Sequence, residues 1–448
     1  MAERGADDVV AAARAVLDRN RRGEWTCPSV VLYPHQWLWD SCFTAIGIAR
    51  YDPERAAGEL RALFRGQWAN GMLPHMLFAP GSRDIGSRRV WQSHRHADAP
   101  RDVATSCITQ PPMVAIAAER VAHALGPDAR AAFVADVLPR IVAHHQWCYR
   151  ERDLDASGLI TLIHPWECGL DSTPPWMDAL CEMRLPLWLR AAERVHLSRL
   201  LRSLRYDTRL LPASERASDD EGLRMLALAV HTKHYDFELR RIPRDDRVVL
   251  HEDLAFNSLL VVANAALARM ADEHARVLPD GLVASTARTR VALETLWDDA
   301  SGTYCSRDAV SARLVRSPTI ATFLPLWAGT PDDGRVARLL ASLQTAHGSW
   351  PAFPVPSVPL DAAAYQETRY WKGPTWVNTN WAIVQGLRAQ GADALADELR
   401  ARTLAMVHDH GFAEYFSART GEPHGARDFS WTAALTIDLA MGGAADAA

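Results

Sequence analysis

Apolar residues recur along most of this chain at the three- and four-residue spacing of amphipathic α-helices. The two-residue alternation that is typical of β-strands is rare and short. The pattern therefore predicts an all-α protein. The predicted helices cover residues near 6–20, 36–50, 53–66, 107–125, 128–150, 175–202, 220–231, 251–274, 280–297, 317–328, 333–344, 374–389, 392–409 and 428–441.

The connections between these helices are of two kinds. Some are tight, such as 51–55 and 329–334, where Pro and Gly separate one helix from the next. Others are long and rich in Trp, His, Pro and Gly. Because short and long connections roughly alternate, we expect helical hairpins arranged in a ring, an (α/α)6 barrel with its long loops on one face. We predict one domain over 1–448, with 68–106 and 203–250 as loop or lid insertions.

Charge and composition exclude several classes of protein. The 448 residues carry a formal net charge of −5, so no basic surface is available for a nucleic acid. The seven cysteines form no CxxC pattern, which argues against a disulfide framework and against a zinc site. Residues 1–20 predict an amphipathic helix rather than a signal peptide, and no apolar run approaches about 18 residues, so we expect no membrane span. These features predict a cytoplasmic protein and leave its oligomeric state open.

Tryptophan is unusually common, with 16 residues against 9 Tyr and 11 Phe. A Trp side chain offers a flat apolar face and one N–H donor, which suit the C–H face of a sugar ring and a hydroxyl at its rim. Any single Trp is more often part of a hydrophobic core. Many of these residues, however, lie in polar loops rather than on helical stripes, which favours a carbohydrate site.

The first cluster of residues that could take part in catalysis or binding is the segment 33–41, YPHQWLWDS. If this segment begins a helix, Gln36, Trp37 and Asp40 share one face. Asp40 could instead cap the helix that follows it. A capping role explains the carboxylate alone but not the aromatic ring and the amide beside it.

The second cluster is HPWECGLDSTPPW at 164–176, where two carboxylates lie in a Gly- and Pro-rich loop between tryptophans. An apolar wall beside a carboxyl group raises its pKa, which keeps the group protonated as a general acid requires. Trp166 and Trp176 would form that wall for Asp171. The alternative is that Asp171 or Ser172 caps a helix that begins at the two prolines.

Two further clusters lie near the C-terminus. Residues 370–381, YWKGPTWVNTNW, place three tryptophans beside Asn378 and Asn380, which would need hydrogen-bond partners if buried. Residues 411–416, GFAEYF, carry Glu414, and Glu422 follows in a Thr-Gly-Glu-Pro turn as a competing carboxylate. Two carboxylates on opposite sides of a tryptophan-lined pocket are what glycosidic cleavage requires. Motifs of rival chemistries, namely GxGxxG, GKS/T, GxSxG and HExxH, are absent from the sequence.

Six motifs in order resemble glycoside hydrolase family 63, and most of all its bacterial glucosylglycerate and mannosylglycerate hydrolases. They are QWLWDS at 36–41, NGMLPHMLF at 70–78, TSCITQPP at 105–112, HPWECGLDSTPPW at 164–176, YWKGPTWVNTNWAI at 370–383 and GFAEYFSARTGEPHG with FSWTAA at 411–433. The resemblance covers nearly the whole chain. It implies an (α/α)6 barrel and an inverting hydrolysis of an α-linked glucose or mannose in a small glycoside, without a cofactor or a metal.

The resemblance also implies roles for individual residues. Asp171 matches the family's general acid and Glu414 its general base, which leaves Glu422 as the weaker candidate. The residues that match the walls, floor and rim of the sugar site are Tyr33, Gln36, Trp37, Trp39, Asp40, His75, Gln110, Trp166, Trp176, Tyr370, Trp371 and Trp376.

The chain departs from the family pattern where the family binds the aglycone. The segment 81–91 lacks the family's tyrosine and carries arginines instead, and Cys168 and Leu170 replace Ser and Met beside the acid. Arg216 matches an arginine that grips the glycerate carboxylate, although the sequence around it diverges. We therefore expect intact hydrolytic machinery with an altered aglycone pocket, in which the loop 81–104 is a candidate for closing on the substrate.

Two other classes of function stay open at this point. An (α/α)6 sugar epimerase or isomerase would use a pair of histidines at the barrel mouth, and the chain has 17 His. A non-catalytic carbohydrate-binding protein would keep the tryptophans without turnover, whereas an enzyme that tailors a secondary metabolite would act on a larger glycoside.

Overall fold

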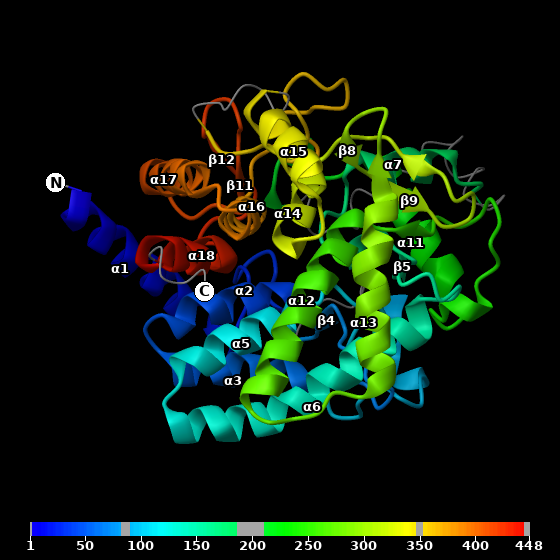
Figure 1. The fold of residues 1–448 in the computed structure, drawn as a ribbon, viewed down its shortest axis with the longest axis horizontal. Coiled ribbons are helices and arrows are strands. Elements are labelled where there is room, and N and C mark those ends of the chain that lie inside the picture. Colours follow the sequence, from blue (N-terminus) through cyan, green and yellow to red (C-terminus); the bar gives the residue numbers. More distant parts are fainter. Residues whose placement is uncertain (1, 82–89, 186–209, 346–352, 443–448) are drawn as a thin grey trace.

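The computed structural model describes residues 2–81, 90–185, 210–345 and 353–442. These residues contain fourteen α-helices, joined by loops and by strands of two or three residues (Figure 1). The all-α class predicted from the apolar spacing is thus confirmed.

Six helices contact one another in a closed cycle, which we call the inner ring. In this cycle α18 packs on α2, α2 on α5, α5 on α12, α12 on α14, α14 on α16, and α16 again on α18. The contact between α18 and α2 closes the ring, because it joins the last helix to the beginning of the chain. The six helices are α2 (Leu38–Ala49), α5 (Val114–Ala124), α12 (Leu254–Glu273), α14 (Leu324–Ala328), α16 (Val377–Ala389) and α18 (Ser430–Met441).

A second set of helices packs on the outside of this ring. α1 lies along α18, so the first and last helices are neighbours (blue and red in Figure 1). α3 packs on α2 and α5, α6 on α5 and α12, α13 on α12, and α17 on α16 and α18, while α15 contacts the segment before α14. The six outer helices are α1 (Ala2–Asn20), α3 (Pro53–Phe64), α6 (Pro127–Arg152), α13 (Asp280–Leu293), α15 (Asp333–Thr345) and α17 (Asp393–His410).

Burial distinguishes the two layers. Every residue of the inner helix α2 is buried, whereas the outer helix α13 buries one stripe consisting of Leu282, Ser285, Thr289, Ala292 and Leu293. A helix that is apolar all round must be covered on all sides, and a helix with one apolar stripe needs a partner on one side only. The apolar residues of the sequence therefore decide which helices form the inner ring.

The helix α12 passes a membrane-span test by length and composition without contradicting the prediction of no membrane span. An 18-residue window of this 20-residue helix has a mean hydropathy of 1.5. In the structure, however, 83% of this stretch is buried against the rest of the protein. Its apolar character is accounted for by its place in the inner ring.

Several helix boundaries differ from the prediction. Residues 36–37 form the strand β3, paired with β4, and α2 begins only at Leu38. The helix predicted from 107 begins at Val114, after the two prolines 111–112, whose nitrogens cannot donate a helical hydrogen bond.

The helix predicted over 175–202 ends at Glu182 as α7 (Pro174–Glu182), and residues 186–202 lie outside the described part. Of the helix predicted over 317–328, only Leu324–Ala328 is α-helical, as α14, and a 3₁₀ turn (Ile320–Phe323) precedes it.

Local sequence signals set several of the helix starts. Asp52 accepts a hydrogen bond from the Arg55 amide (3.1 Å), and Pro53 occupies the first position of α3. Ser218 and Glu221 form a reciprocal capping box at the start of α11 (Asp219–Lys233). These caps use the amides that the first turn of a helix leaves unpaired.

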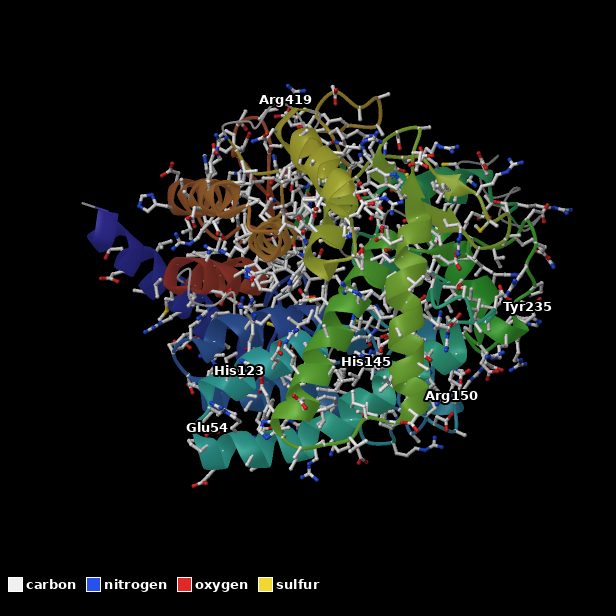
Figure 2. All side chains as sticks on the ribbon, in the orientation of Figure 1. Glu54, His123, His145, Arg150, Tyr235 and Arg419 are labelled. Carbon is white, nitrogen blue, oxygen red and sulfur yellow. The ribbon has the colours of Figure 1, made fainter. Side chains whose placement is uncertain are left out.

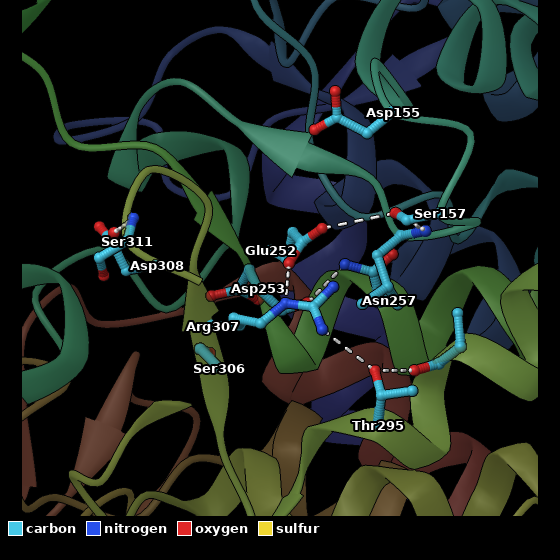
Figure 3. A network of polar contacts seen from close by, with 12 residues as sticks. Asp155, Ser157, Glu252, Asp253, Asn257, Thr295, Ser306, Arg307, Asp308 and Ser311 are labelled. Atoms are coloured by element: carbon cyan, nitrogen blue, oxygen red, sulfur yellow. Dashed lines mark hydrogen bonds and ion pairs between the residues drawn. The ribbon is translucent and has the colours of Figure 1, made fainter. Parts of the chain in front are cut away.

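The strands are short and tie loops together rather than forming a core sheet. Four of them, in the order β10-β9-β6-β5, make an antiparallel sheet that joins three distant loops. Arg307 of β9 holds this sheet by hydrogen bonds to Glu252 of β6 and to Thr295 (3.3 Å) (Figure 3). The strands of this sheet are β5 (Thr161–Leu162), β6 (His251–Glu252), β9 (Ser306–Asp308) and β10 (Leu314–Val315).

The remaining strands form two-stranded pairs. They are β1 (Arg21–Arg22) with β2 (Trp25–Thr26), β3 (Gln36–Trp37) with β4 (Met76–Leu77), β7 (Trp297–Asp298) with β8 (Thr303–Tyr304), and β11 (Tyr415–Phe416) with β12 (Pro423–His424).

The two predicted insertions have different characters in the described residues. Segment 68–106 holds β4 and one 3₁₀ turn (Ser93–Arg95), and its residues 82–89 lie outside the described part. Segment 203–250 is described from residue 210 and contains α11 and two 3₁₀ turns, Ala213–Glu215 and Leu239–Arg241.

The two asparagines of α16 differ in how their side chains are paired. The Asn380 amide donates to the Val355 and Trp376 carbonyls (3.0 and 2.8 Å) and its oxygen accepts from the Val355 amide (2.9 Å). Asn378 is equally buried, but neither polar atom of its side chain has a hydrogen-bond partner in the described protein. It lines a mostly apolar cavity between the inner helices, which Trp39 also lines.

Replacement of Asn378 by Leu should therefore raise the melting temperature, because it removes unpaired buried polar atoms that cost about 1–3 kcal/mol. The matched variant Asn380→Leu should lower it strongly, because it leaves the Val355 amide and carbonyl unpaired. Thermal unfolding of both variants measures the difference. A loss of stability in Asn378→Leu as large as that in Asn380→Leu would contradict this account.

Candidate active site

A pocket of about 340 Å³ lies where the N-terminal ends of several inner helices converge. Its residues come from the segments that lead into α2, α5, α16 and α18, together with the loop before α7. The long loops predicted from the sequence thus meet at one end of the inner ring. The lining residues are Pro28, Tyr33, Trp37, Trp39, Asp40, Gln110, Gly169, Asp171, Tyr370, Glu414, Phe429 and Trp431.

Asp171 is a carboxyl group of this pocket and not a helix cap. The N-cap of α7 is Thr173, so the capping alternative for Asp171 is not what the structure shows. The pKa of Asp171 is raised to about 8, mainly by burial; the charge of Arg216 opposes this rise and the nearby Glu414 carboxylate adds to it. At neutral pH, Asp171 therefore carries a proton that it can donate.

Asp171 is placed by a close approach of the backbone to Trp39. Gly169, two residues earlier, has a φ of +76°, and a side chain there would begin 2.5 Å from the Trp39 indole. Only glycine adopts this conformation without strain and leaves room for the ring. The loop therefore packs directly on Trp39 and directs Asp171 into the pocket.

Glu414 is the second pocket carboxylate, and its side chain is 1% exposed. One oxygen, Oε1, accepts a hydrogen bond from the Tyr33 hydroxyl (2.8 Å) and lies 3.5 Å from the Arg216 guanidinium. The other, Oε2, accepts from the Ala426 amide (2.9 Å). Burial raises the pKa of Glu414, while Arg216, Ala426 and Tyr33 all oppose the rise by stabilising the charged form.

The two buried carboxyl groups therefore receive unequal support. Tyr33, Arg216 and the Ala426 amide all stabilise the charged form of Glu414 against burial, whereas burial outweighs the Arg216 charge at Asp171 and raises its pKa to about 8. Environments that separate the pKa values of two neighbouring carboxyls assign one as an acid and the other as a base. The arrangement can protonate a leaving group and activate a water molecule in the same pocket.

Asp40 is a third carboxyl in the pocket. It lies in the first turn of α2, and the N-cap of that helix is Trp37, so Asp40 is not a cap. Burial raises the pKa of Asp40 well above its usual range, and both Glu414 and Asp171 add to the rise through their charge. A buried polar group at the wall of the pocket is suited to hydrogen bonding with a sugar hydroxyl.

The competing carboxylates of the sequence lie elsewhere. Glu422 is exposed in its turn beyond β11 and does not line the pocket. Glu167 is fully buried and forms a two-pronged ion pair with Arg152 (2.8 and 3.2 Å), while also accepting from the Ile163 amide (2.7 Å). Glu167 thus fixes the loop that carries Asp171.

The structure brings together eight of the predicted site residues in the pocket lining: Tyr33, Trp37, Trp39, Asp40, Gln110, Asp171, Tyr370 and Glu414. Arg216 lies directly behind them, where it donates to the Tyr33 hydroxyl (2.6 Å) and covers the Tyr370 ring (4.3 Å). In this structure its charge faces the pocket carboxylate Glu414 (3.5 Å).

The other predicted residues surround the pocket without lining it. Trp371 and Trp376 are fully buried and stack on each other (3.7 Å), and Trp376 stacks in turn on Tyr415. Gln36 is buried and donates to the Ser41 hydroxyl (3.1 Å). His75 lies edge-on between Trp37 and Trp91.

The two tryptophans expected to wall in Asp171 have other partners. The Trp176 ring is fully buried against His251, and its N–H donates to Asp253 (3.0 Å). Trp166 packs on His164 and Trp91. Among the described residues, the burial of Asp171 comes with pocket neighbours such as Trp39 and Tyr370.

Four lining residues were not among the predicted site residues: Pro28, Gly169, Phe429 and Trp431. Gly169, Phe429 and Trp431 lie inside the conspicuous motifs of the sequence, so their position was a usable signal. Pro28 lies in a plain segment that packs against the start of α18, where Ser430 donates its amide to the Pro28 carbonyl (2.9 Å). Contacts between distant parts of the chain, such as this one, bring Pro28 to the site.

None of the twelve lining residues is a histidine. The adjacent pair His144 and His145 lies on the outer helix α6, buried among the helices (His145 is labelled in Figure 2). Burial lowers the pKa of His145 to about 4, and its ring bonds to Asn264 (2.8 Å). A histidine pair at the mouth of the pocket, as an epimerase would need, is not found among the described residues.

Comparison with known proteins agrees with the family resemblance that the sequence motifs indicated. The family described as the mannosylglycerate hydrolase MGH1-like glycoside hydrolase domain matches residues 33–432. The mannosylglycerate hydrolase of Thermus thermophilus is 39% identical over 94% of this chain and 98% of its own. The chain belongs to glycoside hydrolase family 63.

Other family 63 members agree over nearly the full length. The glucosylglycerate hydrolase of Mycolicibacterium hassiacum is 33% identical over 95% of this chain and 97% of its own. A crystal structure of a family 63 mannosylglycerate hydrolase from Thermus thermophilus, in complex with Tris and D-glycerate, superposes with a TM-score of 0.86 at 36% identity, covering 96% of this chain and 99% of its own. The protein is a glycoside hydrolase, and the epimerase and binding-protein alternatives are not favoured.

The raised pKa of Asp171 predicts how kcat/KM depends on pH. Because desolvation disfavours the carboxylate, the proton is retained up to about pH 8 and is lost as pH rises through that value. We expect kcat/KM to fall there, since it reports the ionisation of the free enzyme. A pH series with a glycoside substrate measures this, and Glu422→Gln serves as a control that should leave the alkaline limb in place. A profile that stays flat into strongly alkaline pH while the protein is folded would refute the assignment of the acid.

Proposed function

We propose that the protein hydrolyses an α-glucoside or α-mannoside with inversion of the anomeric centre, using Asp171 as general acid and Glu414 as general base. The observation that carries this proposal is the unequal support of the two buried pocket carboxyls: Tyr33, Arg216 and the Ala426 amide all stabilise the charged form of Glu414, whereas burial keeps Asp171 neutral. Membership of family 63 supports it.

The fold that we propose for this site is an (α/α)6 barrel. The closed cycle of six inner helices and the six helices outside it support this architecture. In such a barrel the pocket lies at the mouth of the inner ring, where the N-terminal ends of α2, α5, α16 and α18 meet. We keep the single domain, the cytoplasmic location and the absence of a cofactor as predictions from the sequence.

The proposed reaction is a single displacement. Asp171 donates its proton to the glycosidic oxygen as the bond from that oxygen to the anomeric carbon breaks. Glu414 takes a proton from a water molecule, whose oxygen forms the new bond on the opposite face of the ring. The products are a free sugar of inverted configuration and the alcohol of the aglycone. We expect about 6.5–9.5 Å between the two carboxyl groups, which leaves room for the water.

The substrates that we propose are 2-O-α-glycosyl glycerates or close analogues. The relatives named as mannosylglycerate and glucosylglycerate hydrolases support this class. The departures of segment 81–91 from the family pattern suggest an altered aglycone pocket, although its residues 82–89 lie outside the described part. Trp37, Trp39 and Tyr370 would contact the sugar, with Asp40 and Gln110 binding its hydroxyls.

The deciding experiment follows the anomer released from α-glucosides and α-mannosides by proton NMR, with the glycosyl glycerates among the substrates. We expect the β-anomer to appear first. Initial release of the α-anomer would contradict inversion, and no release from any substrate would contradict the proposed substrate class.

Variants of the two carboxyls test their roles. Asp171→Asn and Glu414→Gln should each lower kcat by about 100- to 10,000-fold, because proton donation or water activation is lost. Glu422→Gln is the matched control from the same hairpin and should keep its activity, since Glu422 is exposed outside the pocket. Steady-state kinetics of the folded variants measures these effects. Near-parental activity in Asp171→Asn would reject its role as the acid.

A further inference from the structure

Glu215, a residue outside the pocket, connects the 203–250 insertion to the β11–β12 hairpin next to the proposed base Glu414. Glu215, at the end of the 3₁₀ turn Ala213–Glu215, accepts a hydrogen bond from the Gly425 amide (2.9 Å) through Oε2. Its Oε1 contacts Nδ1 of His424 at 3.2 Å. Both partners lie on the returning side of the β11–β12 hairpin, next to Ala426.

The same hairpin holds Glu414 in place. The Glu414 amide donates to the Ala426 carbonyl (2.8 Å), and the Ala426 amide donates back to Oε2 of the Glu414 side chain (2.9 Å). A side chain at Gly425 would begin 2.5 Å from Oε2, so the backbone of this turn lies directly against the carboxylate. Any shift of residues 424–426 therefore moves a hydrogen-bond donor of the base.

The turn that carries Glu215 is itself fixed to the site. The Tyr415 hydroxyl donates to the Glu215 carbonyl (2.6 Å), and the Thr368 hydroxyl donates to the Ser214 carbonyl (3.3 Å). The next residue, Arg216, faces Oε1 of Glu414. Two consecutive residues thus act on the two oxygens of one carboxylate, Arg216 directly and Glu215 through the backbone of residues 425–426.

We propose that Glu215 is a positioning residue for the general base Glu414: it holds the Gly425–Ala426 backbone so that the Ala426 amide stays on Oε2. The proposal rests on the role of Glu414 given above. Glu215 does not line the pocket, so it contacts neither the sugar nor the water and acts only through the hairpin. On this proposal, the 203–250 insertion does more than lie over the ring as a lid, because its residue Glu215 also helps to position Glu414.

The proposal predicts a specific effect on catalysis. Loss of the Glu215 carboxylate frees the Gly425 amide, and the Ala426 amide then bonds Glu414 less well. Because that bond stabilises the charged form, its loss raises the pKa of Glu414 and moves the acidic limb of the pH profile to higher pH. We expect kcat to fall by about 10- to 100-fold from the misplaced base, with KM nearly unchanged.

The experiment compares Glu215→Ala and Glu215→Gln with a control that loses a buried carboxylate elsewhere. A Gln side chain still accepts from the Gly425 amide, so it should restore part of kcat. The control is Glu252→Ala, which breaks the ion pair with Arg307 in the sheet of Figure 3, away from the pocket. The side chains of Glu215 and Glu252 are similarly buried, at 14% and 10% exposure. The control should lose stability while its kcat and its acidic limb remain those of the parent.

A readout without substrate separates this inference from the proposed function. The carboxyl carbon of Glu414, labelled with ¹³C and assigned through Glu414→Gln, reports the titration of the base in the free protein. We expect its pKa to rise in the order parent, Glu215→Gln, Glu215→Ala. An unchanged titration and an unchanged kcat in a folded Glu215 variant would overturn the positioning role, as would a change in KM alone. Failure of the parent to hydrolyse any glycoside would count against the proposed function, and the titration would still decide the role of Glu215.

Discussion

The burial of two carboxyl groups at one end of the inner ring is the constraint on which the rest of the site depends. A carboxylate taken out of water is costly unless hydrogen bonds or opposite charges support it. Glu414 receives this support from Tyr33, Arg216 and the Ala426 amide, whereas Asp171 responds to burial by holding its proton. The acid and base roles that we propose thus rest on how unequally one pocket supports two similar groups.

The layered fold makes this inequality possible. The inner helices are apolar on nearly every face and must be covered all round, so their N-terminal ends meet at a small region where the loops converge. Each loop is then fixed by its own buried contact. The Arg152–Glu167 ion pair holds the loop of the acid, and the contacts of residues 215 and 216 hold the hairpin of the base. Breaking one partner of such a buried pair leaves the other uncompensated, which makes these contacts rigid supports.

The pocket residues and the segment 81–91 differ in how closely they match the pattern of family 63. The residues that we propose for the sugar site, Trp37, Trp39, Asp40 and Tyr370, match the family pattern and lie together in the pocket lining. The segment 81–91 departs from that pattern. In the function that we propose, specificity for the leaving group and bond cleavage would thus be carried by different parts of the chain.

The sequence by itself determined the helical class and indicated the loops that hold the site, because apolar periodicity and residue type are local properties; its resemblance to family 63 named Asp171 and Glu414 as the candidate carboxyls. It could not decide which tryptophans face the substrate: Trp39 lines the pocket, whereas Trp176, equally prominent in its motif, is buried against His251. It also could not place Pro28 in the pocket or connect Glu215 with Glu414, since those contacts join residues about 200 or more positions apart along the chain. Only the tertiary structure decides such pairings, because they depend on how the helices close into a ring.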